Sequence, residues 1–217
     1  MDPARRIVTA APTFGAILLA GGRASRVDGA AKPLFDVGGQ TLLARAVAAA
    51  AGVGARPIVV AAPVLDPALA VEWAQEDPPF GGPVAGIVAA LRQPDAWARE
   101  PDWTFLLACD LPKVDAAVAR LSSDILLVPT DTDGVCLGDA SSRPQWLTGI
   151  YRTGVLRRAA EAMPDGGRDA PVRALLHGLA ITVIAVPGDL TDDVDTWEDL
   201  SRARAAAGSH PGIEEES

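Results

Sequence analysis

A chain of 217 residues, 49 % of them hydrophobic and 22 % charged, has the length and composition of one globular domain rather than of a disordered protein. Its formal net charge of −9 argues against general nucleic-acid binding, which needs a basic surface. Two cysteines without CxxC spacing indicate neither a disulfide framework nor a zinc site. With no apolar run near the roughly 20 residues of a membrane span and no signal-peptide layout, we expect a cytoplasmic protein.

Short apolar runs alternate with alanine-rich segments after a loose leader at 1–12, which we expect to be flexible. The runs at 14–20, 56–62 and 103–108 are typical of strands buried on both faces. Helices are predicted over 41–51 and 83–91, the latter with a proline suited to its first turn.

In the second half, strands are predicted at 125–129, 145–152 and 181–186, and helices at 153–162 and 196–206. Thr196 is the expected N-cap of the last helix and Asp199 stands at its capping-box position. A disordered acidic tail is expected at 208–217.

Strands that alternate with helices imply right-handed crossovers and a mostly parallel, Rossmann-like α/β sheet with helices on both faces. The stretch 137–152 interrupts this alternation and predicts an antiparallel insertion or edge. We expect one domain over 13–207, whose ligands gather beyond the carboxyl ends of the strands.

A glycine turn followed by three cations comes directly after the first predicted strand. Gly21 and Gly22 allow the backbone to approach a ligand and to point N–H groups at an anion. Arg23, Arg26 and Lys32 follow in an otherwise acidic chain, which indicates a polyphosphate. Neither the Walker A pattern nor GxGxxG is present, so the two common nucleotide motifs do not apply.

Asp110 follows the apolar segment 103–109. A carboxylate at the carboxyl end of a buried strand is well placed to hold Mg²⁺, which binds few protein oxygens and takes its other ligands from phosphates and water. An ordinary helix N-cap is the alternative interpretation of this residue.

Four segments together resemble the nucleotidyltransferases, and most closely the molybdenum cofactor guanylyltransferase family. "LLAGGRASRVDGAAKPL" resembles the signature LxAGGxxxRMGxxDK, and "EDPPFGGPVAGIVAAL" resembles an acidic segment followed by GPxAG. "LLACDLP" is similar to a strand-terminal metal motif, and "DVDTWEDL" resembles (D/N)xDTPEDL. Their order is that of the family, and the resemblance, which spans about 14–204, implies a fold like that of the nucleotide-diphospho-sugar transferases.

The resemblance implies that Lys32 and Arg26 bind the phosphates of the nucleotide and carry catalysis together with Asp110. Cations suit this task because negative charge on the α-phosphate and on the departing pyrophosphate must be neutralised. Asp110 and Asp195 are the implied ligands of Mg²⁺, with capping as the alternative role of Asp195. A phosphomonoester nucleophile is already largely dianionic near neutral pH, so no general base is required.

Further contacts are implied for both substrates. Asp77 is implied to contact the guanine ring, whose N1–H and amino group a carboxylate can accept. Arg143, Gln145 and Arg152 are weaker candidates for the acceptor side, whereas Trp146 and Tyr151 are expected to pack in or around the core. The implied nucleotide-binding set is Leu19, Ala20, Gly21, Gly22, Arg23, Lys32, Asp77, Gly82 and Asp110.

The phosphate loop departs from the family signature in two places. Ala31 replaces the aspartate that usually precedes the lysine, and Val27 and Asp28 replace Met–Gly. These departures weaken the assignment of the base and the acceptor, and leave the expected fold and nucleotide binding intact.

The expected reaction is transfer of GMP from Mg-GTP to a molybdopterin that carries molybdenum. The alternatives are a CTP-dependent enzyme for the same cofactor, nucleotidyl transfer to another phosphorylated small molecule, and an inactive nucleotide-binding protein. Because the acceptor is large and fragile, its handover is expected to use transient contacts with delivering and receiving proteins, without nucleic acid or a membrane.

Overall fold

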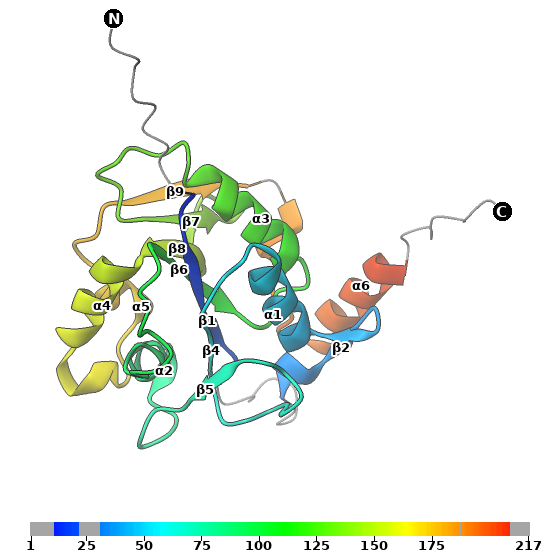
Figure 1. The fold of residues 1–217 in the computed structure, drawn as a ribbon. Coiled ribbons are helices and arrows are strands. Elements are labelled where there is room, and N and C mark those ends of the chain that lie inside the picture. Colours follow the sequence, from blue (N-terminus) through cyan, green and yellow to red (C-terminus); the bar gives the residue numbers. More distant parts are fainter. Residues whose placement is uncertain (1–10, 22–30, 187, 209–217) are drawn as a thin grey trace, which may run out of the picture.

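A seven-stranded sheet forms the centre of the computed structural model, which describes residues 11–21, 31–186 and 188–208. The strand order is β5-β4-β1-β6-β8-β7-β9 (Figure 1). In chain order the strands of this sheet are β1 (Phe14–Leu19), β4 (Ile58–Ala61), β5 (Glu72–Ala74), β6 (Trp103–Ala108), β7 (Gly134–Gly138), β8 (Pro144–Arg152) and β9 (Ile181–Ala185). The expected leader and tail fall mostly in 1–10 and 209–217, outside the described residues.

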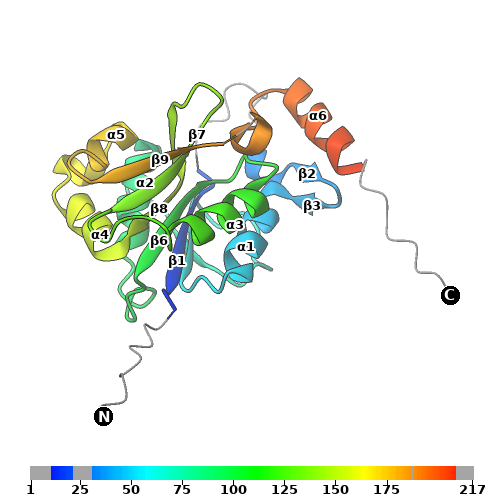
Figure 2. The ribbon, with the colours of Figure 1, turned by 90° about the horizontal axis from the view of Figure 1, so that it is seen from above.

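Helices cover both faces of the sheet. The α-helices are α1 (Leu42–Gly52), α2 (Gly82–Leu91), α3 (Val114–Asp124), α4 (Thr153–Glu161), α5 (Val172–Leu175) and α6 (Trp197–Gly208). Helices α1 and α3 pack on one face and α2, α4 and α5 on the other, while α6 stands beside a small hairpin of β2 (Asp36–Val37) and β3 (Gln40–Thr41) (Figure 2). Within the described residues, no helix combines the length and the apolar character that crossing a membrane requires.

Strand direction places the functional edge of the sheet. β1 pairs in parallel with β4 and β6, β4 with β5, and β7 with β9, whereas β8 runs antiparallel to both β6 and β7. The carboxyl ends of β1, β4, β6 and β7 therefore share one edge. The mostly parallel α/β fold is confirmed, as is the antiparallel interruption in 137–152.

The core is aliphatic and lies in two layers because successive side chains of a strand point to opposite faces. In β6, Phe105 and Leu107 join the cluster under α1 and α3, and Leu106 joins the cluster under α2 and α4. All three side chains are fully buried, as expected for a strand covered on both faces.

The strand predicted at 125–129 is wrong. The chain there forms turns after α3, a helix that we did not predict, and the next strand begins at Gly134. Leu126 and Leu127 are 67 % and 83 % exposed, whereas Ile125 before them is buried in the core, so the run has no strand-like burial pattern. A run of this length does not by itself distinguish a strand from a loop.

Tyr151 anchors the β7–β8 pair. Its ring is fully buried, its hydroxyl donates to the carbonyl of Trp146 at 2.8 Å, and it occupies the space beside Gly134 and Gly149, where any Cβ would collide with it. Tyr151 and Trp146 are thus packing residues, as predicted.

Arg152 lies opposite Trp103, at the start of β6, and therefore at the far edge of the sheet from Asp110. Its Nε donates to the carbonyl of Thr132 at 2.8 Å, and its guanidinium lies 4.5 Å from the Trp103 ring centroid. The acceptor-side hypothesis for this residue is wrong, because its side chain holds the loop before β7.

Candidate active site

Gly21 lies where β1 and β4 end side by side. Its N–H donates to the carbonyl of Ala61 at 3.1 Å, and a Cβ at Gly21 would stand 3.2 Å from the same oxygen. A side chain would press on the backbone of β4, so glycine permits the close approach. The predicted contacts Gly22, Arg23 and Arg26, and also Asp28, lie outside the described residues.

A cavity of about 310 Å³ opens beyond this turn, a size within the usual range of small-molecule sites. On the β4–β5 side its lining includes Pro63, Leu65 and Phe80, and on the β6 side Lys32 and Asp110. The complete lining is Leu19, Ala20, Gly21, Ala31, Lys32, Pro33, Ala62, Pro63, Leu65, Gln75, Glu76, Phe80, Cys109 and Asp110. The cavity thus has a mostly apolar side, which also carries Gln75 and Glu76, and a side with Lys32 and Asp110, which suits a ligand with a flat ring and a phosphate chain.

Three carboxylates gather at the charged side. Asp110, Asp193 and Asp195 each offer an oxygen, and these atoms lie within 4.8 Å of one another. The backbone explains the juxtaposition, because the N–H of Val194 donates to the carbonyl of Asp110 at 2.9 Å and ties the segment before α6 to the end of β6.

Lys32 connects the cluster to the phosphate loop. It opens a short 3₁₀ turn, Lys32–Leu34, and its Nζ donates to Oδ1 of Asp195 at 2.6 Å. The two side chains are 17 % and 36 % exposed, so the ion pair is only partly screened by water. A compact ammonium beside a cavity is suited to binding a phosphate.

The electrostatics of the cluster favour a divalent cation. Burial and the nearby Asp193 carboxylate raise the pKa of Asp110 to about 6, although Lys32 partly offsets them. Burial and Asp195 likewise raise the pKa of Asp193. The three carboxylates repel one another, and the single lysine beside them does not balance their negative charge. Carboxylate oxygens are also the ligands that Mg²⁺ prefers, so these residues fit this ion.

Neither Asp110 nor Asp195, the two predicted metal ligands, caps a helix through its side chain. Lys113 precedes α3 at its N-cap, and no side chain makes the cap hydrogen bond there, so Asp110 does not cap this helix. At α6, Thr196 Oγ1 accepts from the N–H of Asp199, while Asp199 Oδ2 accepts from the N–H of Thr196 at 2.8 Å. This capping box is confirmed, and the Asp195 carboxylate accepts from Lys32 instead.

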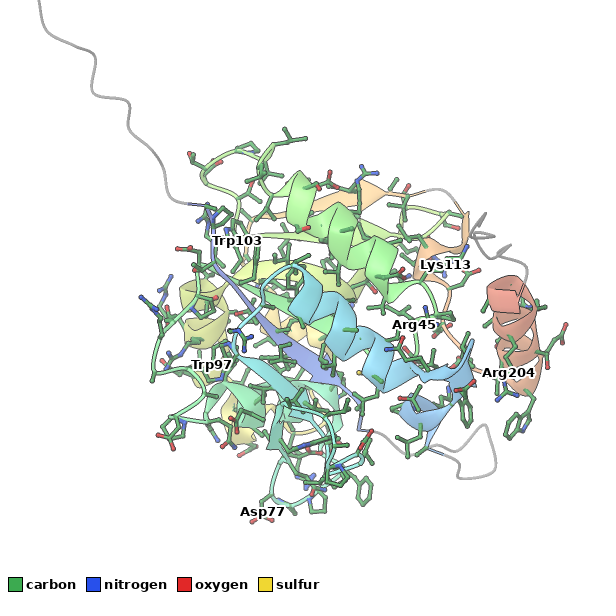
Figure 3. The ribbon with its side chains drawn as sticks, turned by 45° about the vertical axis from the view of Figure 1, so that its right-hand side comes forward. Arg45, Asp77, Trp97, Trp103, Lys113 and Arg204 are labelled. Atoms are coloured by element: carbon green, nitrogen blue, oxygen red, sulfur yellow. The ribbon has the colours of Figure 1, made fainter. Side chains whose placement is uncertain are left out.

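The remaining predicted residues lie near the cavity or at the same edge without lining it. Asp77 is exposed and points outward at the tip of its loop (Figure 3), and Gly82 begins α2 with a φ of +88°. Arg143 and Gln145 belong to the β7–β8 hairpin, where Asp139 accepts from the Arg143 N–H at 3.0 Å and from the Gln145 amide at 3.2 Å. Their contacts with substrates stay predictions.

Sequence reasoning did not assign the roles of Asp193, Gln75, Glu76 or Phe80. A signal for Asp193 was present, since residues two apart in an extended segment point to one side, and Asp193 and Asp195 have this spacing. No comparable signal marks the other three, because lining depends on how the loop after β5 folds back.

Comparison with known proteins places this geometry in context. The family model described as "MobA-like NTP transferase domain" matches residues 16–205. A probable molybdenum cofactor guanylyltransferase of Synechococcus elongatus is 33 % identical over 168 residues, which is 72 % of this chain and 80 % of that protein. A molybdenum cofactor guanylyltransferase of a Bradyrhizobium species is 29 % identical over 198 residues, covering 88 % of this chain and 92 % of its own length.

Among solved structures, a nucleotidyl transferase from Methanothermobacter shares the fold with a TM-score of 0.65 and 19 % identity. The match covers 90 % of this chain and 97 % of that one.

Proposed function

The chain belongs to the family of MobA-like NTP transferase domains and is a nucleotidyltransferase, and from this we propose its specific reaction. We propose that it transfers GMP from Mg-GTP to the terminal phosphate of molybdenum-molybdopterin and releases pyrophosphate. The observation that carries the proposal is that Lys32 and Asp110 line one side of a cavity whose other side is mostly apolar, while Asp193 and Asp195 gather beside them. The names of the curated relatives support the choice of guanylyl group and acceptor.

Lys32 is assigned to the phosphate chain. Without a ligand its ammonium is held by Asp195 at 2.6 Å, and a bound triphosphate competes for the same ammonium. A cation bound by the three carboxylates, Asp110, Asp193 and Asp195, supplies further charge neutralisation to the phosphates. Together these groups stabilise the negative charge that develops during transfer.

The transfer itself requires no proton acceptor from the protein. An oxygen of the acceptor's dianionic phosphomonoester forms a bond to the α-phosphorus of GTP, while the bond from that phosphorus to the bridging oxygen of the β-phosphate breaks. The electron pair leaves with pyrophosphate. The tasks left to the chain are alignment of the two substrates and stabilisation of charge.

The nucleobase is assigned to the β4–β5 side of the cavity. Pro63, Leu65 and Phe80 provide apolar surface there, and Glu76 adds a carboxylate at the wall. We therefore propose Glu76 as the acceptor for guanine N1–H and the amino group, whereas Asp77, the next residue, points away from the cavity. Cytosine lacks an N–H at the corresponding ring position, so this arrangement favours GTP over CTP.

A nucleotide panel tests the proposal. Thermal unfolding is followed with GTP, CTP, ATP or UTP, each with Mg²⁺ and each again with EDTA. GTP at about 100 times its Kd should add about 2.7 kcal/mol of stability, a shift of several degrees, and EDTA should reduce it. Stabilisation by CTP but not by GTP would refute the guanylyl assignment. Release of pyrophosphate from GTP only when molybdopterin is present then distinguishes an enzyme from an inactive binding protein.

A further inference from the structure

Pro63, Leu65 and Phe80 form the apolar wall of the cavity, and Phe80 has an unusual backbone conformation. Phe80 lines the cavity, is 58 % exposed and has a φ of +64°. A bulky side chain rarely adopts the left-handed region, which costs on the order of 1–3 kcal/mol and persists only where surrounding contacts impose it. The question is therefore what holds the segment around Phe80.

A second loop, far away in sequence, supplies the contacts. Nη2 of Arg168 donates to the carbonyl of Pro78 at 3.0 Å and to that of Pro79 at 3.4 Å. The N–H of the next residue, Asp169, donates to the carbonyl of Gly81 at 2.7 Å. Carbonyls on both sides of Phe80 are thus bound by two adjacent residues of one loop.

The wall is also tied to the cavity side. Glu76, which lines the cavity, accepts from the N–H of Gly81 at 3.1 Å through Oε1. Both backbone groups of Gly81 are therefore engaged, the N–H by Glu76 and the carbonyl by Asp169. Phe80 lies between these two attachments and the Arg168 contacts, so its backbone is held on both sides.

The loop that carries Arg168 is itself seated on α2. Gly166 and Gly167 have φ values of +63° and +78°, and a Cβ at Gly167 would stand 2.5 Å from Cγ1 of Val84. This close approach brings the segment Pro164–Gly167 against the helix that begins at the end of the wall. Arg168 directly follows this segment and binds the backbone of residues 78 and 79, but it does not line the cavity itself.

We propose that Arg168 is a positioning residue, which holds Phe80 at the rim so that its ring forms a stacking surface for the nucleobase. The inference rests on the proposed function, because it takes the cavity to be the nucleotide site. Stacking on an aromatic face tolerates every base. Arg168 therefore affects the affinity for every nucleotide, and it does not take part in the chemistry at Lys32 and Asp110.

The binding experiment compares the wild type with Arg168→Ala, Arg168→Lys and the control Arg173→Ala, which removes an exposed arginine of neighbouring α5. Titration with Mg-GTP and Mg-CTP should give Kd values about tenfold weaker for Arg168→Ala with either nucleotide. Arg168→Lys should be intermediate, because one ammonium lacks the planar fork, and Arg173→Ala should match the wild type. In steady state KM should rise while kcat stays within about twofold.

A double-mutant cycle tests whether Arg168 acts through the ring. Phe80→Gly removes the ring and accepts the positive φ without strain. If the proposal holds, the double variant Phe80→Gly/Arg168→Ala binds nucleotide no more weakly than Phe80→Gly alone. Additive losses would overturn it, as would an unchanged Kd in Arg168→Ala or a loss in kcat with KM unchanged.

Hydrogen exchange without nucleotide separates this inference from the proposed function. Arg168→Ala should accelerate amide exchange in residues 76–81 while the free energy of global unfolding stays close to that of the wild type. If the wild type binds no nucleotide, the proposed function fails and the stacking role fails with it. If the wild type binds nucleotide but exchange at 76–81 is unchanged in the variant, the positioning role alone is overturned.

Discussion

Asp110→Asn should make the metal-free protein more stable while it abolishes transfer. In the wild type, burial and Asp193 raise the pKa of Asp110 from 3.8 to about 6. This shift corresponds to about 3 kcal/mol of unfavourable free energy for the ionised form in the folded state. The penalty is absent below the unfolded pKa, develops as the pH rises from about 4 to 6, and is complete above the folded pKa. Asparagine has nearly the same shape and carries no charge.

Urea unfolding in EDTA measures this effect. At pH 7.5 we expect Asp110→Asn to raise the free energy of unfolding by about 1–3 kcal/mol, and at pH 4 the gain should nearly vanish. Asp131→Asn, at an exposed position, is the matched control and should change stability by less than about 0.5 kcal/mol. With Mg²⁺ and GTP the ranking should reverse, because only the wild type retains the three carboxylates. A variant no more stable than the wild type in EDTA at pH 7.5 would refute the reasoning.

Three further changes test other parts of the structure. Lys32→Ala should weaken GTP binding by at least about tenfold in titration calorimetry, since it removes the ammonium beside the cavity, and an unchanged Kd would contradict its phosphate role. Gly167→Ala should lower the free energy of unfolding in urea by about 2–4 kcal/mol, because it adds a 2.5 Å contact with Val84 to an unfavourable φ. The control Gly178→Ala, at a φ of +88° with open space around it, should lower it by only about 1–2 kcal/mol. Equal losses in the two variants would exclude the Val84 contact as a cause. Asp102 accepts from the N–H and hydroxyl of Thr13 at 2.8 and 2.7 Å, and these bonds lower the pKa of Asp102. Asp102→Ala should therefore destabilise the protein at pH 7, and progressively less as the pH falls through the acid range. A loss of stability that does not depend on pH would indicate packing rather than charge.

The sheet and its functional edge were largely predictable from the sequence. The runs that became β1, β4 and β6 are almost entirely apolar and are followed by glycine, alanine or a carboxylate, a pattern typical of a covered parallel strand. The predicted position of Asp110 at the end of such a strand follows directly from this pattern.

What escaped prediction depends on tertiary contacts. Helix α3 and the turns after it were missed because Ile125, Leu126 and Leu127 form an apolar run whose exposure is decided by where the helix ends. The roles of Glu76 and Phe80 were missed because Arg168, which shapes their loop, lies about 90 residues further along the chain.

The hydrogen bond from the N–H of Val194 to the carbonyl of Asp110 joins two parts of the site that are synthesised at very different times. The strands and glycine turn that line the cavity all precede residue 111, whereas Asp193 and Asp195 lie near the end of the chain. Lys32 and its partner Asp195 are 163 positions apart. A ribosome therefore makes the strands and turn that line the cavity well before it adds Arg168, which holds the segment around Phe80, and the aspartates that complete the acidic cluster. Transferase activity should accordingly arise only after residues 193–195 have been synthesised.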